Sequence, residues 1–122
     1  ECARIGEVSW RPMDGELGQT VVVVMVSVAN QEEAGKIADL VVRSRLAACA
    51  STIPTVQSTY RWEGKIVKDQ ESLIFMKTTS DKVLPLQEAI LKAHSYKVPE
   101  IIAISVTHGF QPYLDWVRSE VS

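Results

Sequence analysis

The chain has 122 residues, a formal net charge of −2 at pH 7, 46% hydrophobic residues and 23% charged residues. This length suits one domain with one core, and the slightly acidic balance excludes the basic face that nucleic-acid binding needs. No apolar run approaches the ~20 residues of a membrane span, and residues 1–20 lack the apolar segment of a secretory signal. We therefore expect a cytosolic protein with no nucleic-acid and no membrane partner.

The two cysteines, Cys2 and Cys49, show none of the Cys-x-x-Cys spacing that marks zinc or redox sites. Cys49 is expected to be a small buried side chain on a strand. A disulfide to Cys2 is the minor alternative, because it would suit an oxidising compartment that nothing else in the sequence indicates.

Residues 1–20 differ from the rest of the chain, since glycines and a proline interrupt them and no hydrophobic period is sustained. We predict an N-terminal extension, residues 1–20, followed by a single domain, residues 21–122.

The domain begins with a continuous β-branched run, residues 21–28, which is typical of a strand buried on both faces. Asn30 followed by Glu33 indicates a helix N-cap with an acidic residue three positions on, a variant of the capping box. Apolar residues then recur with helical spacing and predict a helix over residues 31–46.

A second strand is expected over residues 48–62, with Pro54 at a sheet edge or a bulge, because proline cannot donate to the ladder. A turn at 63–65 leads back to a third strand, residues 72–77. Ser80 or Asp81 is expected to cap the next helix.

That second helix runs to His94, with Pro85 in its first turn. A fourth strand, residues 100–106, and a closing helix, residues 112–120, complete the domain. The order β-α-β-β-α-β with right-handed crossovers predicts an α+β, ferredoxin-like antiparallel sheet of strand order 4-1-3-2, with an extra C-terminal helix.

Two helices of this length cover one face of such a sheet, yet both faces are apolar. Leu73 and Phe75 point one way, whereas Ile74 and Met76 point the other. Monomers rarely expose an apolar patch on the order of several hundred Å². We expect an oligomer; the alternative is that residues 1–20 and the last helix cover the second face.

Tyr60 and Trp62 alternate, so they share one face at the end of the long hairpin. Aromatic residues of this kind are enriched at interfaces, and an interface anchor is favoured over a stacking or ligand pocket.

Lys77-Thr78-Thr79 lies where a strand meets a helix, a place where anions bind at helix N-termini, although no glycine accompanies it. His94 and His108 are the only histidines, and neither has the paired spacing of a strong preformed metal site. The sequence contains no nucleophile elbow and no Gly-rich phosphate loop. We expect no catalytic residues and no enzyme activity.

Several motifs resemble the CutA divalent-cation-tolerance family. They are Arg45-Leu46-Ala47-Ala48-Cys49 with Ile53-Pro54, Tyr60-Arg61-Trp62-Glu63-Gly64-Lys65-Ile66, Lys77-Thr78-Thr79, Tyr96-Lys97-Val98-Pro99-Glu100-Ile101 and Tyr113-Leu114-Asp115-Trp116. The resemblance covers residues 21–117 and implies a homotrimer of ferredoxin-like subunits with long hairpins reaching between neighbours. It also implies tolerance or binding of divalent metal ions, copper above all, without an agreed enzymatic activity.

Two departures from the family concern copper. Ser27 stands where some bacterial members carry a Cys near the end of the first strand, and His94-Ser95-Tyr96 replaces the usual His-Pro-Tyr. A thiolate is the ligand best suited to Cu(I), so its loss leaves His94 as the candidate metal ligand and Cu(II) as the preferred ion.

The sequence therefore predicts a trimeric, non-catalytic protein of the divalent-cation-tolerance type, with copper as its candidate metal and no other cofactor. The first alternative is a PII-like trimeric signalling protein that binds a small molecule or anion between subunits, with Lys77 or Arg61 as the cation. An acylphosphatase-type enzyme is disfavoured, because the segment after the first strand, residues 28–33, is acidic and lacks arginine.

Overall fold

The structure, a computed structural model, describes residues 20–122. The predicted extension before Thr20, and with it Cys2 and the alternative disulfide, lies outside the described residues. Cys49 carries a free thiol and is half-buried, so the expectation that it is buried is wrong. The elements follow in the order β1 (Val21–Val28), α1 (Gln31–Arg43), β2 (Cys49–Trp62), β3 (Lys65–Thr79), the 3₁₀ turn η1 (Ser80–Lys82), α2 (Val83–Ala93), β4 (Ile101–Ser105) and α3 (Gln111–Val121).

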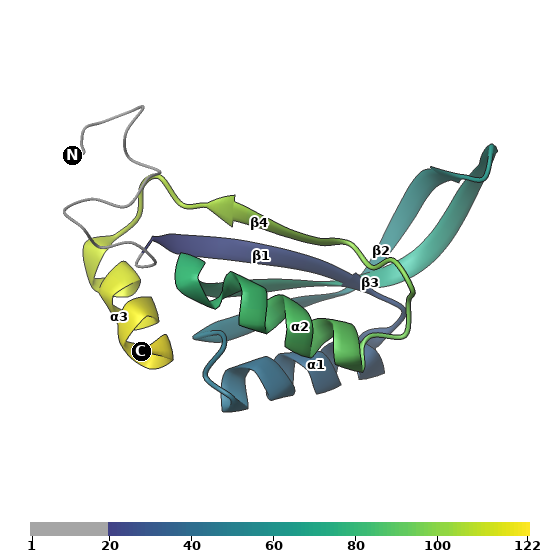
Figure 1. Ribbon diagram of the computed structural model, residues 1–122. Helices are drawn as coiled ribbons and strands as arrows, with labels where there is room; N and C mark the ends of the chain where they lie inside the picture. Colours follow the sequence, from purple (N-terminus) through teal and green to yellow (C-terminus); the bar gives the residue numbers. More distant parts are fainter. Residues whose placement is uncertain (1–19) are drawn as a thin grey trace.

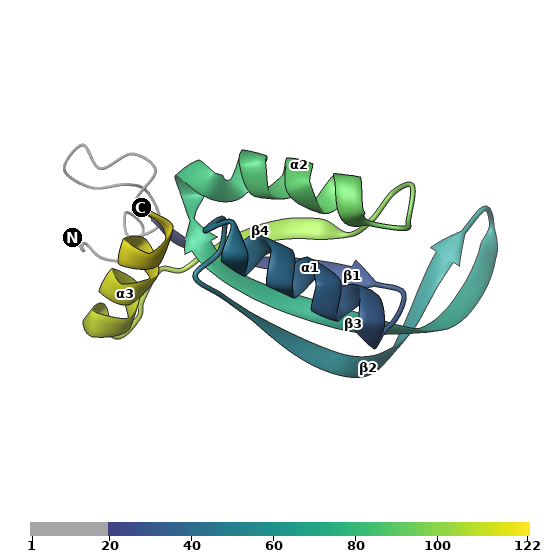
Figure 2. The ribbon, with the colours of Figure 1, turned by 90° about the horizontal axis from the view of Figure 1, so that it is seen from below.

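The four strands form one antiparallel sheet of order β2-β3-β1-β4, which is the predicted order 4-1-3-2 counted from the opposite edge. Helices α1 and α2 lie side by side on one face of this sheet, and α3 lies across one end of it (Figures 1 and 2). The ferredoxin-like α+β fold is confirmed.

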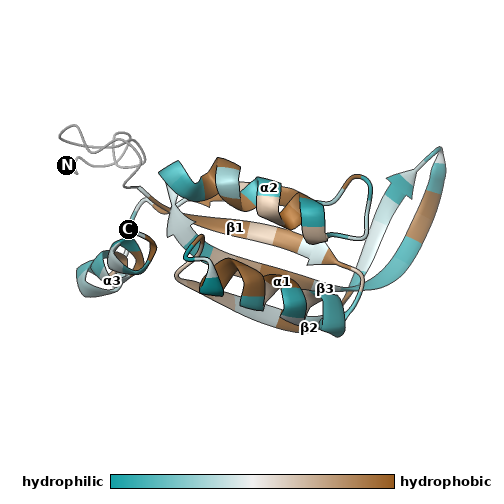
Figure 3. Cartoon of the chain, turned by 60° about the horizontal axis from the view of Figure 1, so that its bottom comes forward, coloured by the Kyte–Doolittle hydropathy of each residue, from teal (hydrophilic) through white to brown (hydrophobic). Residues whose placement is uncertain are grey.

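The main core lies between the sheet and helices α1 and α2. Every second residue of β1 points to the helices, and the apolar sides of both helices face the sheet (Figure 3). The largest buried members are Val24 and Val26 of β1, Ile74 and Met76 of β3, Ile37 and Val41 of α1, and Leu86 and Ile90 of α2.

The opposite face of the sheet, called the open face below, is apolar as predicted. Met25 lies between Phe75 and Ile102 in the register of the three strands. Ile102 and Ile104 of β4 are 46% and 51% exposed. Within residues 20–122, α3 covers one end of this face through a small cluster of Val21, Ala48, Val117 and Val121.

Helix α1 begins as predicted, because the Asn30 side chain accepts a hydrogen bond from the Glu33 amide at 2.9 Å. It ends at Arg43 rather than at residue 46. Arg45 adopts a left-handed conformation (φ 61°), and the amide of Leu46 bonds back to the Val41 carbonyl. This αL ending has no glycine, which is the usual sequence signal for it.

Strand β3 begins at Lys65, far before the predicted residue 72, and pairs with β2 along a long hairpin. Glu63 and Gly64 both have positive φ (51° and 79°), as a tight two-residue hairpin turn requires. The ladder shifts register between Ile53 and Val56, so the predicted bulge at Pro54 is confirmed. The outer hairpin extends beyond the helices and is largely hydrophilic, which explains why hydrophobic patterning predicted the hairpin but missed the first residues of β3, 65–71 (Figure 3).

Helix α2 starts after the turn η1, with Pro85 in its first turn as predicted. Neither Ser80 nor Asp81 caps it with a side-chain hydrogen bond, so that expectation is wrong: η1 precedes the helix and supplies the turn instead. None of the helices in residues 20–122 is long and apolar enough to cross a membrane.

Candidate functional site

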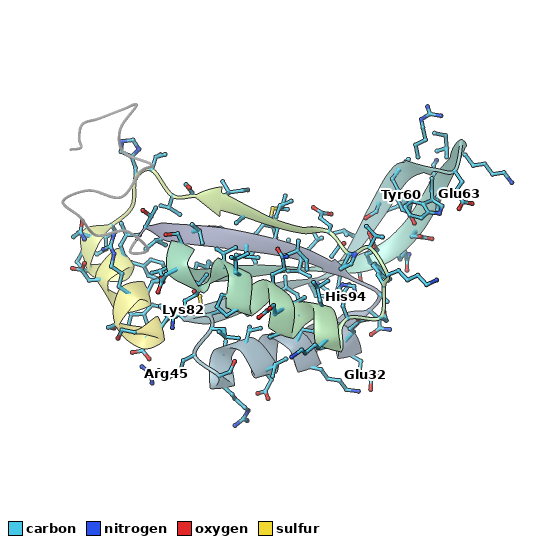
Figure 4. All side chains as sticks on the ribbon, in the orientation of Figure 1. Glu32, Arg45, Tyr60, Glu63, Lys82 and His94 are labelled. Atoms are coloured by element: carbon cyan, nitrogen blue, oxygen red, sulfur yellow. The ribbon has the colours of Figure 1, made fainter. Side chains whose placement is uncertain are left out.

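His94 follows the last residue of α2, where the backbone leaves the helix in an extended conformation (φ −88°, ψ 143°). Its imidazole is completely buried, and it lies away from the hairpin tip that carries Tyr60 and Glu63 (Figure 4). Nε2 lies 2.6 Å from the main-chain oxygen of Ser27, and Nδ1 lies 3.0 Å from the main-chain nitrogen of Tyr96.

These two contacts fix the tautomer of the ring. The Tyr96 amide can only donate, so Nδ1 accepts; the Ser27 carbonyl can only accept, so Nε2 carries the proton. Both ring nitrogens of the neutral imidazole are therefore engaged within the fold.

Glu33 of α1 holds the segment that follows His94. Its Oε2 accepts the Ser95 amide and its Oε1 accepts the Ser95 hydroxyl, both at 2.9 Å. Glu33 Oε2 also lies 3.4 Å from Nδ1 of His94. Burial alone would raise the pKa of Glu33, but the hydrogen bonds from the amide and the hydroxyl of Ser95 lower it below its ordinary value.

Tyr96 joins this segment to β3. Its hydroxyl donates to Oε2 of Glu71 at 2.8 Å, and its ring lies against the His94 ring at a centroid distance of 4.8 Å. Burial, followed by the bond to Glu71, raises the pKa of Tyr96 far above its ordinary range. The phenol therefore stays neutral and keeps donating.

Glu33, Ser95, Tyr96 and Glu71 were not predicted as partners of His94. Glu33 had been interpreted only as part of a helix cap, and its bonds to Ser95 join residues far apart in sequence. The one available signal was the motif His94-Ser95-Tyr96, which the family resemblance had singled out.

Ser27 is next to His94, but the contact is made by its main-chain carbonyl. Its neighbours Val26 and Val28 point into the helix-covered core, so by strand alternation the Ser27 side chain points to the open face, opposite Leu73. A side chain at position 27 therefore points away from the helix side of the sheet.

Residues 20–122 contain no group of three or more His, Cys, Asp or Glu side chains arranged to hold a metal ion. With both nitrogens of His94 bonded, the described part of a single chain does not fit a preformed metal centre. His94 as a metal ligand stays a prediction.

A cavity of about 370 Å³ lies where the start of α1 faces the bulge of β2. Most of its lining residues are of polar type, and they come from residues 29–32, 54–55 and 70–72. Glu71, which accepts the Tyr96 hydroxyl, forms part of its wall and links it to the His94 segment.

At the far end of the hairpin, Trp62 is 54% exposed. The Tyr60 hydroxyl is bonded to Asp69 on the neighbouring strand. The hairpin tip and the His94 segment are thus separate parts of the molecule (Figure 4).

The topology, the two-layer packing and the apolar open face together define a ferredoxin-like α+β protein with a long projecting hairpin. The profile of the family described as CutA1 divalent ion tolerance protein matches residues 22–120. The chain belongs to the CutA family, as the motifs had indicated.

The chain is similar to the divalent-cation tolerance protein CutA of Thermus thermophilus, at 44% identity over 96 residues that cover 79% of this chain and 93% of that protein. It is 41% identical over 98 residues to the chloroplastic protein CutA of Arabidopsis thaliana, covering 80% of this chain and 54%, or about half, of the plant protein. The solved structure of the Thermus thermophilus protein superimposes with a TM-score of 0.82 and 41% identity, over 84% of this chain and 99% of that one.

Proposed function

We propose that the protein works as a homotrimer of the divalent-cation-tolerance type, which responds to or binds divalent metal ions, copper among them, without conventional catalysis. The observation that carries the self-association is the apolar open face of the sheet.

The open face presents Met25 and Phe75 at its centre and the exposed Ile102 and Ile104 along β4. Covering a few hundred Å² of apolar surface is worth on the order of 5–10 kcal/mol at about 25 cal/mol per Å². A second copy of the chain presents the same apolar face, so packing two copies together removes both apolar surfaces from water. The number of three subunits comes from the family resemblance.

The metal role is supported by the words that name the family and the Thermus thermophilus relative. His94 is the candidate copper ligand, and Nδ1 is its only nitrogen with a lone pair, since Nε2 carries the proton. Copper would have to displace the Tyr96 amide from Nδ1, with Glu33 as the nearest carboxylate. We therefore propose weak binding.

Light scattering coupled to size exclusion tests the assembly. We expect a mass of three times 13.5 kDa, and a mass of 13.5 kDa at micromolar concentration would overturn the proposal. Ile104→Glu should leave the subunit folded but weaken its self-association, because it places a charge on the open face. Leu84→Glu is the matched control, since Leu84 is 71% exposed on α2.

The PII-like alternative makes a different prediction. A small anion or nucleotide would raise the melting temperature while Cu²⁺ would not, and a thermal-shift screen separates the two. The cytosolic location also stays a prediction, because the Arabidopsis thaliana relative is named as chloroplastic.

A further inference from the structure

Lys77 lies on the open face, not at a helix N-terminus. The register pairs it with Cys49 of β2 on one side and Val23 of β1 on the other. Its neighbours in sequence, Met76 and Thr78, point to the helix side and are fully buried. We expected Lys77-Thr78-Thr79 to mark an anion site at the start of a helix, but Lys77 does not lie at such a helix start.

Two bonded pairs of polar groups lie on the open face around the Lys77–Cys49 register pair, and we call them the Lys77 cluster: Lys77 with Ser51, and Cys49 with Tyr113. The Lys77 ammonium donates to the Ser51 hydroxyl at 3.3 Å. The thiol of Cys49 lies 3.5 Å from the hydroxyl of Tyr113, which α3 brings to the edge of the sheet.

The Lys77 cluster contains a positive charge and no negative one. Among the ion pairs of residues 20–122, none brings a carboxylate within 4.0 Å of the Lys77 ammonium. The bond to Cys49, with burial, raises the pKa of Tyr113 to about 12, so its phenol is neutral at physiological pH. The Tyr113 hydroxyl is occupied by its bond to Cys49, so the free donors of the cluster are the remaining protons of the Lys77 ammonium and the Ser51 hydroxyl.

The apolar surroundings of Lys77 raise the free-energy cost of leaving its ammonium without an acceptor. The lysine is half-buried beside apolar residues, among them Val23 and Phe75. When another copy covers the open face, the ammonium loses water, and a buried charge without a partner is strongly destabilising. Its remaining donors need an acceptor with a negative charge.

We propose that the Lys77 cluster is a carboxylate-binding site on the open face. The carboxylate has two possible sources: an acidic side chain of a second copy, or a small free carboxylate ion. The first source rests on the proposed self-association, and the proposal deepens that function. Both sources offer the same chemistry, two oxygens that accept from the Lys77 ammonium and the Ser51 hydroxyl.

The test compares Lys77→Met, which keeps the length of the side chain and removes its charge, with Lys92→Met, which removes an exposed lysine from α2. In the first arm, melting temperature is measured in sodium acetate and in sodium succinate against sodium chloride at equal ionic strength. In the second arm, light scattering over a dilution series measures the concentration at which the assembly half-dissociates. Lys77→Gln repeats both arms in case the methionine variant fails to fold.

A free carboxylate predicts that acetate or succinate raises the melting temperature of the wild type and of Lys92→Met, but not of Lys77→Met. A carboxylate from a second copy predicts no such response and an assembly at least about tenfold weaker in Lys77→Met. If Lys77→Met equals Lys92→Met in both arms, the carboxylate site is overturned while the trimer stands. A wild type that stays at 13.5 kDa overturns the trimer and the second-copy source, and the acetate arm then decides the site alone.

Discussion

Nε2 of His94 donates to the main-chain oxygen of Ser27 at 2.6 Å. This bond satisfies the carbonyl of β1 that lies just beyond the first residue of β4. The Ser27 amide donates to the Glu100 carbonyl at 3.3 Å, but β4 begins only at Ile101. In an antiparallel ladder the amide and carbonyl of one residue bond to the same neighbouring strand. The imidazole thus supplies the donor that a further β4 residue would otherwise provide.

His94→Ala should lower the free energy of unfolding by about 2–4 kcal/mol, because it leaves a cavity and removes the partners of the Ser27 carbonyl and the Tyr96 amide. Urea unfolding at one fixed protein concentration measures this, with Lys92→Ala on the exposed side of α2 as the control. Equal stability of the two variants would show that the imidazole does not stabilise the fold.

Glu33→Gln should weaken the fold at neutral pH by about 1–2 kcal/mol and reduce its acid sensitivity, because the neutral amide that replaces the carboxylate accepts no charge-assisted bond from Ser95. The pKa of Glu33 is lowered in the folded state, so the ionised carboxylate stabilises the fold above pH 4.5. This stability is lost as the pH falls through the lower, folded pKa. The urea midpoint is measured between pH 7 and pH 3 for the wild type, for Glu33→Gln and for the control Glu88→Gln, which changes an exposed residue. If the midpoints of both variants follow those of the wild type at every pH, the stabilising role of Glu33 is refuted.

Trp62→Ala should weaken the proposed assembly by about 2–4 kcal/mol and leave the subunit fold intact, since Trp62 lies beyond the core and is 54% exposed. Light scattering on dilution measures the assembly, and circular dichroism monitors the fold. Lys65→Ala is a fitting control, because Lys65 is the cross-strand partner of Trp62. An unchanged assembly in Trp62→Ala would assign this tryptophan to a ligand pocket or to free surface.

Copper(II) should bind with a dissociation constant in the micromolar range or weaker, because His94 must first release the Tyr96 amide. The corresponding binding free energy is about −8 kcal/mol or less favourable. Calorimetry on the wild type and on His94→Ala checks the ligand. Ser27→Cys should leave Cu(I) affinity unchanged, since side chain 27 points to the open face. A nanomolar constant, or binding that survives in His94→Ala, would show that other residues hold the metal.

The sequence predicted the elements whose side chains alternate between core and open face, such as β1 and the inner half of β3. It missed the outer half of that strand, residues 65–71, because pairing with β2 alone holds it and no core imposes an apolar pattern. His94 was identified, but its partners were not. The bonds of Glu33 to Ser95 depend on how α1 and α2 pack, which no local pattern encodes. Strand alternation alone puts Lys77 on the face of Phe75, but its cross-strand neighbours Cys49 and Ser51 follow from the register with β2.

The bulge at Pro54 has a consequence for how the edge of the sheet can pair with further strands. Strand β2 is a long edge strand, and a regular edge of unpaired amides and carbonyls is a template for further strands. Pro54 lacks an amide proton, the register shifts beside it, and its carbonyl already accepts the Ser72 hydroxyl. An incoming strand therefore meets an interrupted ladder midway along β2, while the other edge, β4, is only five residues long. Both edges favour a closed assembly of a few copies over open-ended growth of the sheet.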